Sequence, residues 1–298
     1  MDTALGMQSA HEWGGAALKT TAAGSAAPSD ASLLLRPGWT SPGALGRELV
    51  ASRELCLTLA RKDFFVRYRR AALGIVWAIA LPALQAVVLA VILSRVARIH
   101  VDHYAIFILS GIVAWTYFAS TLGAASTSIV DNSALSSRIY FPRAVLPISA
   151  CLSNLFAMLI SFVITVVVAV ATGAVPGLTL LYILPGVGLI FLLTVSATLV
   201  LSALHVYFRD VKYAVQAGLL VWFYVTPVFY PVTLLHGLAR RAVEANPVSG
   251  CVELFQGAVL GTPVSAVSIS YTVACTAALL VAAVFLHCRH DRTFADLL

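Results

Sequence analysis

The sequence predicts an all-α integral membrane protein, with six transmembrane helices behind an amphipathic helix at the membrane surface. Hydrophobic residues fill 60% of the 298 positions and charged residues only 11%, whereas soluble domains carry about 25% charged residues. Long apolar segments recur along the chain, and a helix of about 20 residues crosses a bilayer. The net charge of +6 is therefore interpreted as orienting the chain and meeting anionic lipid headgroups, not as binding nucleic acid.

Two segments precede the apolar region. Residues 1–43 are rich in Ala, Gly, Ser, Thr and Pro without helical periodicity, which predicts a disordered tail. Residues 44–71 predict an amphipathic helix, which packs on the cytoplasmic membrane surface or on a partner. The alternative is a cluster of charges that only sets membrane orientation. The expected apolar stripe is Leu57, Ala60, Phe64 and Tyr68, and the residues assigned to the interface are Arg61, Phe64, Arg67, Tyr68 and Arg70.

A transmembrane domain is predicted over residues 72–290, followed by a cytoplasmic tail over residues 291–298. Its prolines are tolerated because neighbouring helices can satisfy the freed carbonyl groups. The six predicted spans lie at 72–94, 104–127, 144–172, 178–207, 213–231 and 264–287.

Basic residues near the span ends predict that both termini lie in the cytoplasm, because Lys and Arg favour the inner side. With that orientation the inner side holds Arg61, Lys62, Arg67, Arg69, Arg70, Arg138, Arg143, Arg209, Lys212, Arg289 and Arg292. The outer side holds Arg95, Arg98, Arg240 and Arg241. The Arg95 and Arg98 pair fits this orientation least well.

The predicted spans contain no Asp, Glu, Lys or Arg. Carriers driven by ion gradients usually keep an ionisable group at membrane depth, so this class is disfavoured. It stays open because backbone carbonyls can bind sodium. A membrane enzyme is also disfavoured, since no base, nucleophile and metal ligands converge at one depth.

The chain is expected to bind no metal or cofactor itself. Its five cysteines show no CxxC spacing. Lys19 and Thr20 follow Leu18, which occupies the position where a phosphate-binding loop requires glycine. The energy for transport is therefore expected from a separate ATPase subunit.

Two predicted cytoplasmic loops suit contact with such a subunit. Residues 131–147 read DNSALSSRIYFPRAVLP, in which Asp131, Asn132 or Ser133 can cap a short helix and Pro142 and Pro147 end the loop. Residues 207–213 read YFRDVKY. Hydrophilic turns without a partner are the alternative. The residues assigned to ATPase coupling are Asp131, Arg138, Tyr140, Arg143, Arg209 and Asp210.

Over about residues 47–295 the chain resembles the permease subunits of ABC-2 type exporters, in the branch that exports lipid-linked polysaccharides, O antigens and teichoic acids. The resemblance rests on the joint order of several motifs. These are RKDFFVRYRRAALGIVWAIALP entering the first span, FPRAVLP entering the third, YFRDVKY after the fourth, VTPVFYP ending the fifth, and ANP at 245–247.

The resemblance implies the ABC-2 permease architecture of a type V-like exporter. It implies a homodimeric channel in which each copy docks on an ATP-binding cassette subunit that holds ATP and Mg. The helix over 44–71 would then be an interface helix, and the loop around 131–143 the main coupling helix. Gln256 departs from the family pattern, which commonly has arginine there, so the role of that arginine is not transferred.

Aromatic residues on three predicted spans suggest a path for sugar rings, although Trp and Tyr also enrich at every membrane interface. The segment 231–261 is expected on the outer side, either as a re-entrant helix or as a surface loop. The residues assigned to the substrate channel are Trp77, Trp115, Tyr117, Phe118, Trp222, Tyr224, Phe229 and Tyr230.

The resulting hypothesis is a permease in the inner membrane of a bacterium, which exports a lipid-linked polysaccharide (O-antigen, capsular or teichoic-acid-like). Its expected partners are a second copy of itself, two ATPase subunits, the glycan and membrane lipids, without nucleic acid. The alternatives are an ABC-2 exporter of drugs or lipids, a secondary carrier, and a membrane-bound glycan enzyme.

Overall fold

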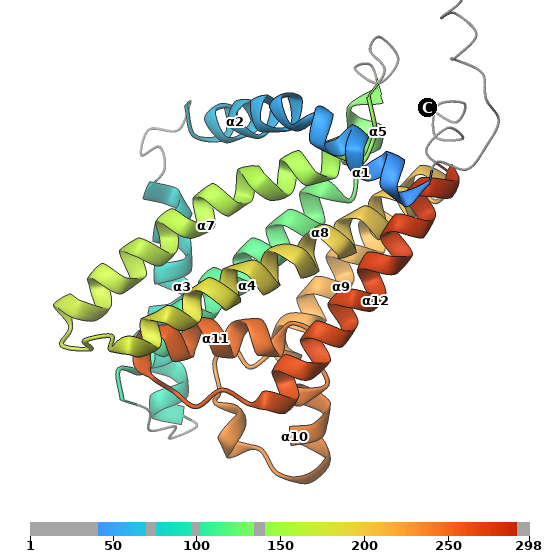
Figure 1. The fold of residues 1–298 in the computed structure, drawn as a ribbon. Helices are drawn as coiled ribbons and strands as arrows, with labels where there is room; N and C mark the ends of the chain where they lie inside the picture. The colour runs from blue at the N-terminus through green and yellow to red at the C-terminus, as the bar shows by residue number, and fades with distance from the viewer. Residues whose placement is uncertain (1–40, 70–75, 97–101, 134–140, 291–298) are drawn as a thin grey trace, which may run out of the picture. The chain divides into compact units, whose positions relative to one another are not determined.

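The computed structural model describes residues 41–69, 76–96, 102–133 and 141–290, and all regular elements in these ranges are helical (Figure 1). The chain divides into two units, Met1–Gly38 and Trp39–Leu298, and every described residue lies in the second. The all-α prediction is confirmed for this part of the chain.

The amphipathic segment forms two helices, α1 (Pro42–Ala51) and α2 (Arg53–Arg69), where one was expected. The Ser41 hydroxyl accepts a hydrogen bond from the Ala44 N–H and starts α1, with Pro42 in its first turn. The buried face of α2 contains Cys56 and Ala60, whereas Leu57 is 44% exposed. Helix α2 places Cys56 against Phe141, Val145 and Leu146, whereas Leu57 stays available to lipid or to a partner, so the expected stripe stays a prediction there.

Four of the six predicted spans are confirmed as helices long and apolar enough to cross a membrane. The third and fourth spans are α7 and the continuous pair η3 and α8. The four are α4 (Tyr104–Ala125), α7 (Val145–Ala171), η3 (Leu178–Tyr182) with α8 (Ile183–Tyr207), and α12 (Ala266–His290).

The first and fifth predicted spans contain shorter apolar helices, α3 (Trp77–Val96) and α9 (Val211–Val225). Residues 70–75, at the predicted start of the first span, lie outside the described residues. The fifth span was predicted to reach residue 231, which is wrong. Thr226 precedes Pro227 and is extended, with ψ 138°, because proline disfavours helical backbone in the residue before it. At 1.5 Å per residue α9 is about 22 Å long, short of a hydrocarbon core of about 30 Å.

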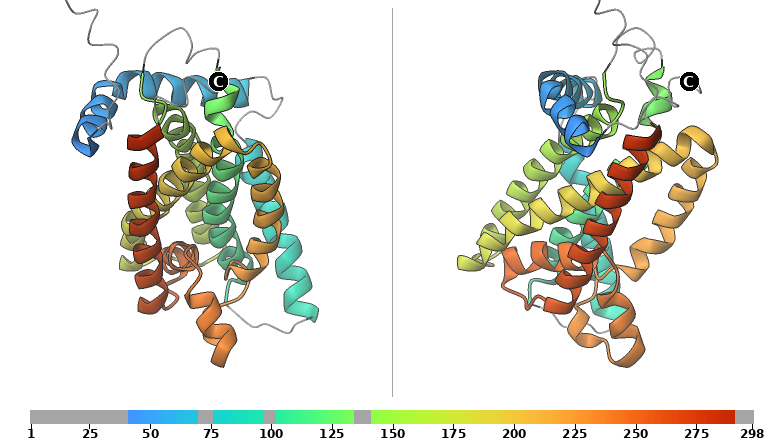
Figure 2. Two further views of the ribbon diagram at one scale, coloured as in Figure 1. Left: turned by 90° about the vertical axis from the view of Figure 1, so that its right-hand side faces the viewer. Right: turned by 45° about the vertical axis from the view of Figure 1, so that its right-hand side comes forward.

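Helix α4 lies in the centre of the bundle, where it packs against α3, α7, α8, α9 and α11. Two ends of the bundle can be distinguished. Helix α2 crosses one end, called here the α2 end, and α10 (Gly237–Glu244) lies at the other, called here the α10 end (Figures 1 and 2).

The segment 231–261 contains η4 (Val232–Leu234), α10 and α11 (Ser249–Leu260). Every residue of α11 from Ser249 to Val259 is buried, because α4, η3, α8 and α12 surround it. A surface loop is therefore excluded for this part of the segment.

Candidate functional site

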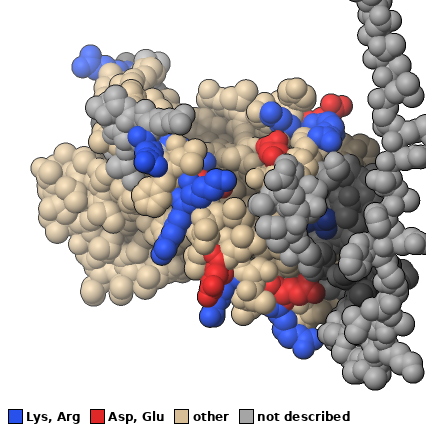
Figure 3. All heavy atoms as spheres, turned by 90° about the horizontal axis from the view of Figure 1, so that it is seen from above, with Lys and Arg blue, Asp and Glu red and all other residues tan. Residues whose placement is uncertain are grey.

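The α2 end carries exposed charges of both signs (Figure 3). At the opposite end the described exposed basic residues are Arg95, Arg240 and Arg241. The exposed basic residues at the α2 end are Arg47, Arg53, Arg61, Lys62, Arg67, Arg69, Arg209, Lys212 and Arg289.

Two loops that are far apart in sequence meet at the α2 end. The one-turn helix α5 (Ser128–Asp131) is held there because Ile129 is fully buried against Ala203 and Val206 of α8. Asp131 accepts a hydrogen bond from the Thr127 hydroxyl at 2.6 Å, which fixes its carboxylate. The structure thus brings α5 against the end of α8, from which the second predicted coupling loop continues.

The charged residues of these two loops interact electrostatically with the same side chain, His205. Asp131, Arg209 and Lys212 all lie within electrostatic range of His205, which is buried at the end of α8. Asp131, Arg209 and Asp210 are exposed, so their side chains are accessible to a partner protein. The assignment of these residues to ATPase coupling stays a prediction.

The remaining coupling assignments are placed differently. Arg138 and Tyr140 lie outside the described residues, together with most of the expected coupling helix. Arg143 is only 7% exposed, so in this structure its side chain is buried just before the start of α7. The Asn132 amide donates to the Ser128 carbonyl at 2.8 Å and closes α5.

Besides the apolar contact of Cys56, helix α2 makes an aromatic and a polar contact with α7. The rings of Phe64 and Phe156 meet edge to face with centroids 6.2 Å apart. Arg67 donates a hydrogen bond to the side-chain oxygen of Asn154, which is 3% exposed. Arg61 is exposed, and the Tyr68 side chain and Arg70 lie outside the description. Sequence reasoning missed Asn154, although a lone amide within an apolar segment was a visible signal.

The aromatic residues assigned to a substrate channel fall into three groups. Trp115, Tyr117 and Phe118 of α4 are buried in the protomer core, at 7%, 3% and 1% exposure. Trp77 and Tyr224 are exposed, at 45% and 67%. Channel lining stays a prediction, and it applies most directly to these two exposed rings. The third group is half-buried and consists of Trp222, Phe229 and Tyr230.

The end of α9 is joined to the segment before α11 by a buried amide. Asn246 accepts a hydrogen bond from the Trp222 indole N–H and donates one to the Thr226 hydroxyl, both at 3.0 Å. The Gln256 amide on α11 donates to the Pro227 and Val228 carbonyls at 3.0 and 3.2 Å. The VTPVFYP and ANP motifs therefore form one contact, in which Gln256 satisfies carbonyls freed where α9 ends.

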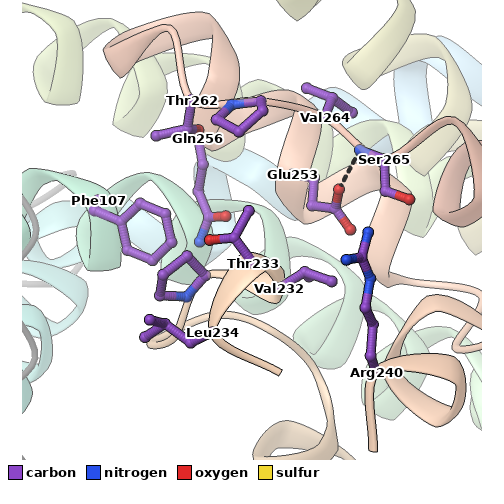
Figure 4. Close-up of a pocket in the computed structure, with 12 residues that line it drawn as sticks. Phe107, Val232, Thr233, Leu234, Arg240, Glu253, Gln256, Thr262, Val264 and Ser265 are labelled. Carbon is purple, nitrogen blue, oxygen red and sulfur yellow. Dashed lines mark hydrogen bonds between the residues drawn. The ribbon is translucent and has the colours of Figure 1, made fainter. Parts of the chain in front are cut away.

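A cavity of about 410 Å³ opens at the α10 end (Figure 4). Its wall includes the Phe107 ring and side chains that exchange hydrogen bonds. Glu253 and Gln256, which lie one turn apart on α11, border it together with Arg240 of α10. The hydroxyl groups that border it belong to Thr233, Thr262 and Ser265.

A network of two buried carboxylates connects α10 and α11 beside this cavity. Glu253 accepts a hydrogen bond from the Ser265 N–H at 2.7 Å. The Ser265 hydroxyl donates to Glu244 at 3.1 Å, and Arg240 donates to the same oxygen at 2.9 Å. Burial raises the pKa of the Glu253 carboxyl, and the hydrogen bond from the Ser265 N–H opposes that rise. Sequence reasoning assigned no role to these residues.

The raised pKa of Glu253 predicts a pH dependence of stability. The folded state binds the Glu253 proton more tightly than the unfolded state does. The contribution of this proton to folding stability is therefore complete at low pH and is lost as pH rises through the folded-state pKa. Glu253→Gln stays neutral, so its advantage in thermal unfolding midpoint over the parent should grow from about pH 5 to about pH 8. Glu253→Ala loses the bond to Ser265 and should cost about 1–3 kcal/mol.

The control for this measurement is Glu54→Gln, at an exposed carboxylate on α2. Its unfolding midpoint should follow the parent across the pH range. If Glu253→Gln also follows the parent, burial does not govern the protonation of Glu253.

The helices and their long apolar surfaces define the chain as an all-α integral membrane protein. Comparison with known proteins makes this class more specific. The family profile described as ABC-2 type transporter matches residues 54–260, and the chain belongs to this family.

Three relatives carry the name O-antigen export system permease protein RfbA. The protein from Myxococcus xanthus is 30% identical over 215 residues, which cover 71% of this chain and 82% of the relative. Two proteins from Klebsiella pneumoniae are 27% and 29% identical over 201 and 217 residues. These alignments cover 67% and 70% of this chain, and 77% and 82% of the relatives.

Proposed function

We propose that the chain is the channel-forming subunit of an ABC exporter, which moves a lipid-linked polysaccharide across the cytoplasmic membrane of a bacterium. The observation that carries the proposal is the similarity, over most of the chain, to three permeases named for O-antigen export. The exported glycan would be of O-antigen, capsular or teichoic-acid type.

The structure supports a division of labour with a separate ATPase. The described spans are apolar, while exposed charges from α5 and the α8–α9 loop gather at the α2 end. A subunit of this kind binds no nucleotide itself and takes energy from a partner that binds ATP and Mg. In this arrangement α1 and α2 form the interface helices, and the loop around 131–143 forms the main coupling contact.

The distribution of charge supports the proposed orientation. The exposed Lys and Arg of the α2 end outnumber those of the α10 end among the described residues. This excess agrees with the positive-inside rule if the α2 end faces the cytoplasm, and we propose that both termini are cytoplasmic. The glycan would leave past the α10 end, where the cavity beside Glu253 and Gln256 offers hydrogen bonds to hydroxyl groups.

The proposed assembly contains two copies of this chain and two ATP-binding cassette subunits. Each copy contributes six membrane helices, with α3 and α9 as the first and fifth. The exposed apolar side chains of these two helices, including Leu84 and Leu220 at 63% and 73%, are available to lipid or to the second copy.

Transport in inverted membrane vesicles tests the proposal. Vesicles that contain the chain and its ATPase partner should accumulate radiolabelled lipid-linked glycan when ATP is added. Export should stop with an ATPase-inactive partner and should continue with an ionophore, because no ion gradient is used. Glycan uptake driven by an ion gradient alone would indicate a secondary carrier, and ATP-driven movement of other lipids or drugs without glycan would reject the polysaccharide assignment.

A further inference from the structure

A pocket of about 180 Å³ lies where α2 meets the membrane helices α3, α4 and α7. We call it the Arg67 pocket, after the charged side chain that borders it. Its polar lining includes Arg67, Thr116, Ser120, Asn154 and Ser161. Among the described residues that line it there is no Asp or Glu, so the pocket combines one positive charge with amide and hydroxyl groups.

The Asn154 amide has hydrogen-bonding capacity left over. Its oxygen accepts the hydrogen bond from Arg67, while its nitrogen, Nδ2, is buried without a partner among the described residues. A buried N–H group without an acceptor destabilises the protein. An acceptor that enters the pocket would remove this destabilisation.

Arg67 has no salt bridge to a described residue. Arg67 also borders a neighbouring cavity, which Asp63 and Asp131 line as well, but neither of these carboxylates lines the Arg67 pocket. The guanidinium, which is exposed and forms five N–H donors, therefore retains donors for a ligand. Arg67 and Asn154 both line the pocket, and the ligand that their N–H donors fit is an anion with several acceptor oxygens.

The other walls of the pocket are apolar. Leu81, Pro82, Val113 and Met158 line it, and Trp77 stands at its edge at the start of α3. Leu81 and Trp77 are 58% and 45% exposed, so the pocket opens toward the side where a lipid chain can enter. Tryptophan at a helix end, such as Trp77, and arginine on a surface helix, such as Arg67, are both common at the depth of the lipid headgroups.

We propose that the Arg67 pocket binds the phosphate group of a membrane lipid. Arg67 and Nδ2 of Asn154 donate hydrogen bonds to the phosphate oxygens, and the first methylene groups of the lipid chain lie against Leu81 and Pro82. The volume holds a phosphate with a few more atoms and is too small for an oligosaccharide. The phosphate can come from a bilayer phospholipid or from the phosphorylated carrier of a lipid-linked glycan, and the second source rests on the proposed function.

Lipid retention by the full-length chain, purified in detergent, tests this inference. The probes are dioleoylphosphatidylglycerol, farnesyl diphosphate, and dioleoylglycerol, which lacks phosphate. Bound lipid is counted by native mass spectrometry. The two phosphate-bearing probes should be retained, and dioleoylglycerol should be retained about tenfold less, as expected when charge-assisted hydrogen bonds to phosphate are missing.

Two variants separate phosphate binding from a structural role. Asn154→Asp keeps an acceptor for Arg67 and so keeps the contact between α2 and α7, but it removes the N–H donor and adds a negative charge. Arg67→Gln removes the positive charge from an exposed position. Both should lower retention of the phosphate probes about tenfold. The matched control is Arg69→Gln, an exposed arginine on the same helix that does not border the pocket, and it should retain the parent level.

Competition between the two phosphate probes assigns the source. Displacement of phosphatidylglycerol by equimolar farnesyl diphosphate indicates the carrier lipid, and the reverse indicates a bilayer phospholipid. Equal losses in Arg67→Gln and Arg69→Gln, unchanged retention in Asn154→Asp, or equal retention of dioleoylglycerol would each overturn the proposal. Because the assay contains neither ATP nor glycan, its failure leaves the proposed export function untouched, and a failure of export leaves this result standing.

Discussion

Replacing Gly250 with alanine is expected to destabilise the protein by about 3 kcal/mol, through overpacking between α11 and α12. A Cβ atom at Gly250 would lie 2.7 Å from the Thr272 hydroxyl, 2.9 Å from the Ser268 carbonyl oxygen and 3.0 Å from the Ile269 Cα. Two of these three atoms belong to the backbone of α12 and cannot rotate away. The two helices must separate, which also strains the contact between α11 and α4.

Thermal unfolding in detergent measures this effect, with a lower midpoint by roughly 5–10 °C expected for a chain of this size. The matched control is Gly188→Ala, a glycine inside α8 with no atom within 4 Å of its added Cβ. If both variants unfold at the same temperature, the close packing of α11 on α12 is not a main source of stability.

The spans were predictable because a long apolar stretch in the sequence indicates a helix buried in lipid. The third and fourth were placed to within a residue of the helices α7 and η3 with α8. The end of the fifth span was not predicted correctly. The hydrophobic pattern continues past Thr226, but Pro227 makes the backbone of Thr226 extended and ends the helix. The local rule for proline was available and should have outweighed the apolar pattern.

Contacts between distant segments could not be predicted from local patterns. Helix α11 lies in a segment for which a surface loop was one expectation, yet it is buried on all sides, because four other helices enclose it. Arg67 and Asn154 are 87 positions apart, and nothing in either local sequence indicates that they meet. Residues at the α2 end were assigned from loop position and charge, which identifies accessible groups but not their neighbours.

The same limit applies to Arg143. As a basic residue in a predicted loop it was assigned to ATPase coupling, but the FPRAVLP motif packs against α2, and Arg143 is buried there. Asp131 and Arg209, in contrast, are both exposed and both act on His205. Asp210 is exposed too, so among the described coupling residues Asp131, Arg209 and Asp210 are accessible to a partner, and their role in coupling stays a prediction.

Reversing the charge of Asp131 or of Arg209 is expected to lower ATP-dependent export about tenfold, because placing like charges across an interface costs several kcal/mol. The variants are Asp131→Arg and Arg209→Glu, and the double reversal distinguishes two causes. If the charges act mainly on each other within the protomer, the double variant should recover export. If they contact the ATPase, it should stay defective, and we expect this result because both side chains are exposed.

Co-purification with the ATPase subunit accompanies the export assay, and weaker association is expected in all three variants. Arg241→Glu at the α10 end is the matched control, since it reverses an exposed charge on the face that lies opposite the proposed contact. Its association with the ATPase should equal that of the parent. Full export and full association in Arg209→Glu would show that the α8–α9 loop is not part of the contact with the ATPase. Contact through α5 would then depend on Asp131 and on the loop that follows it.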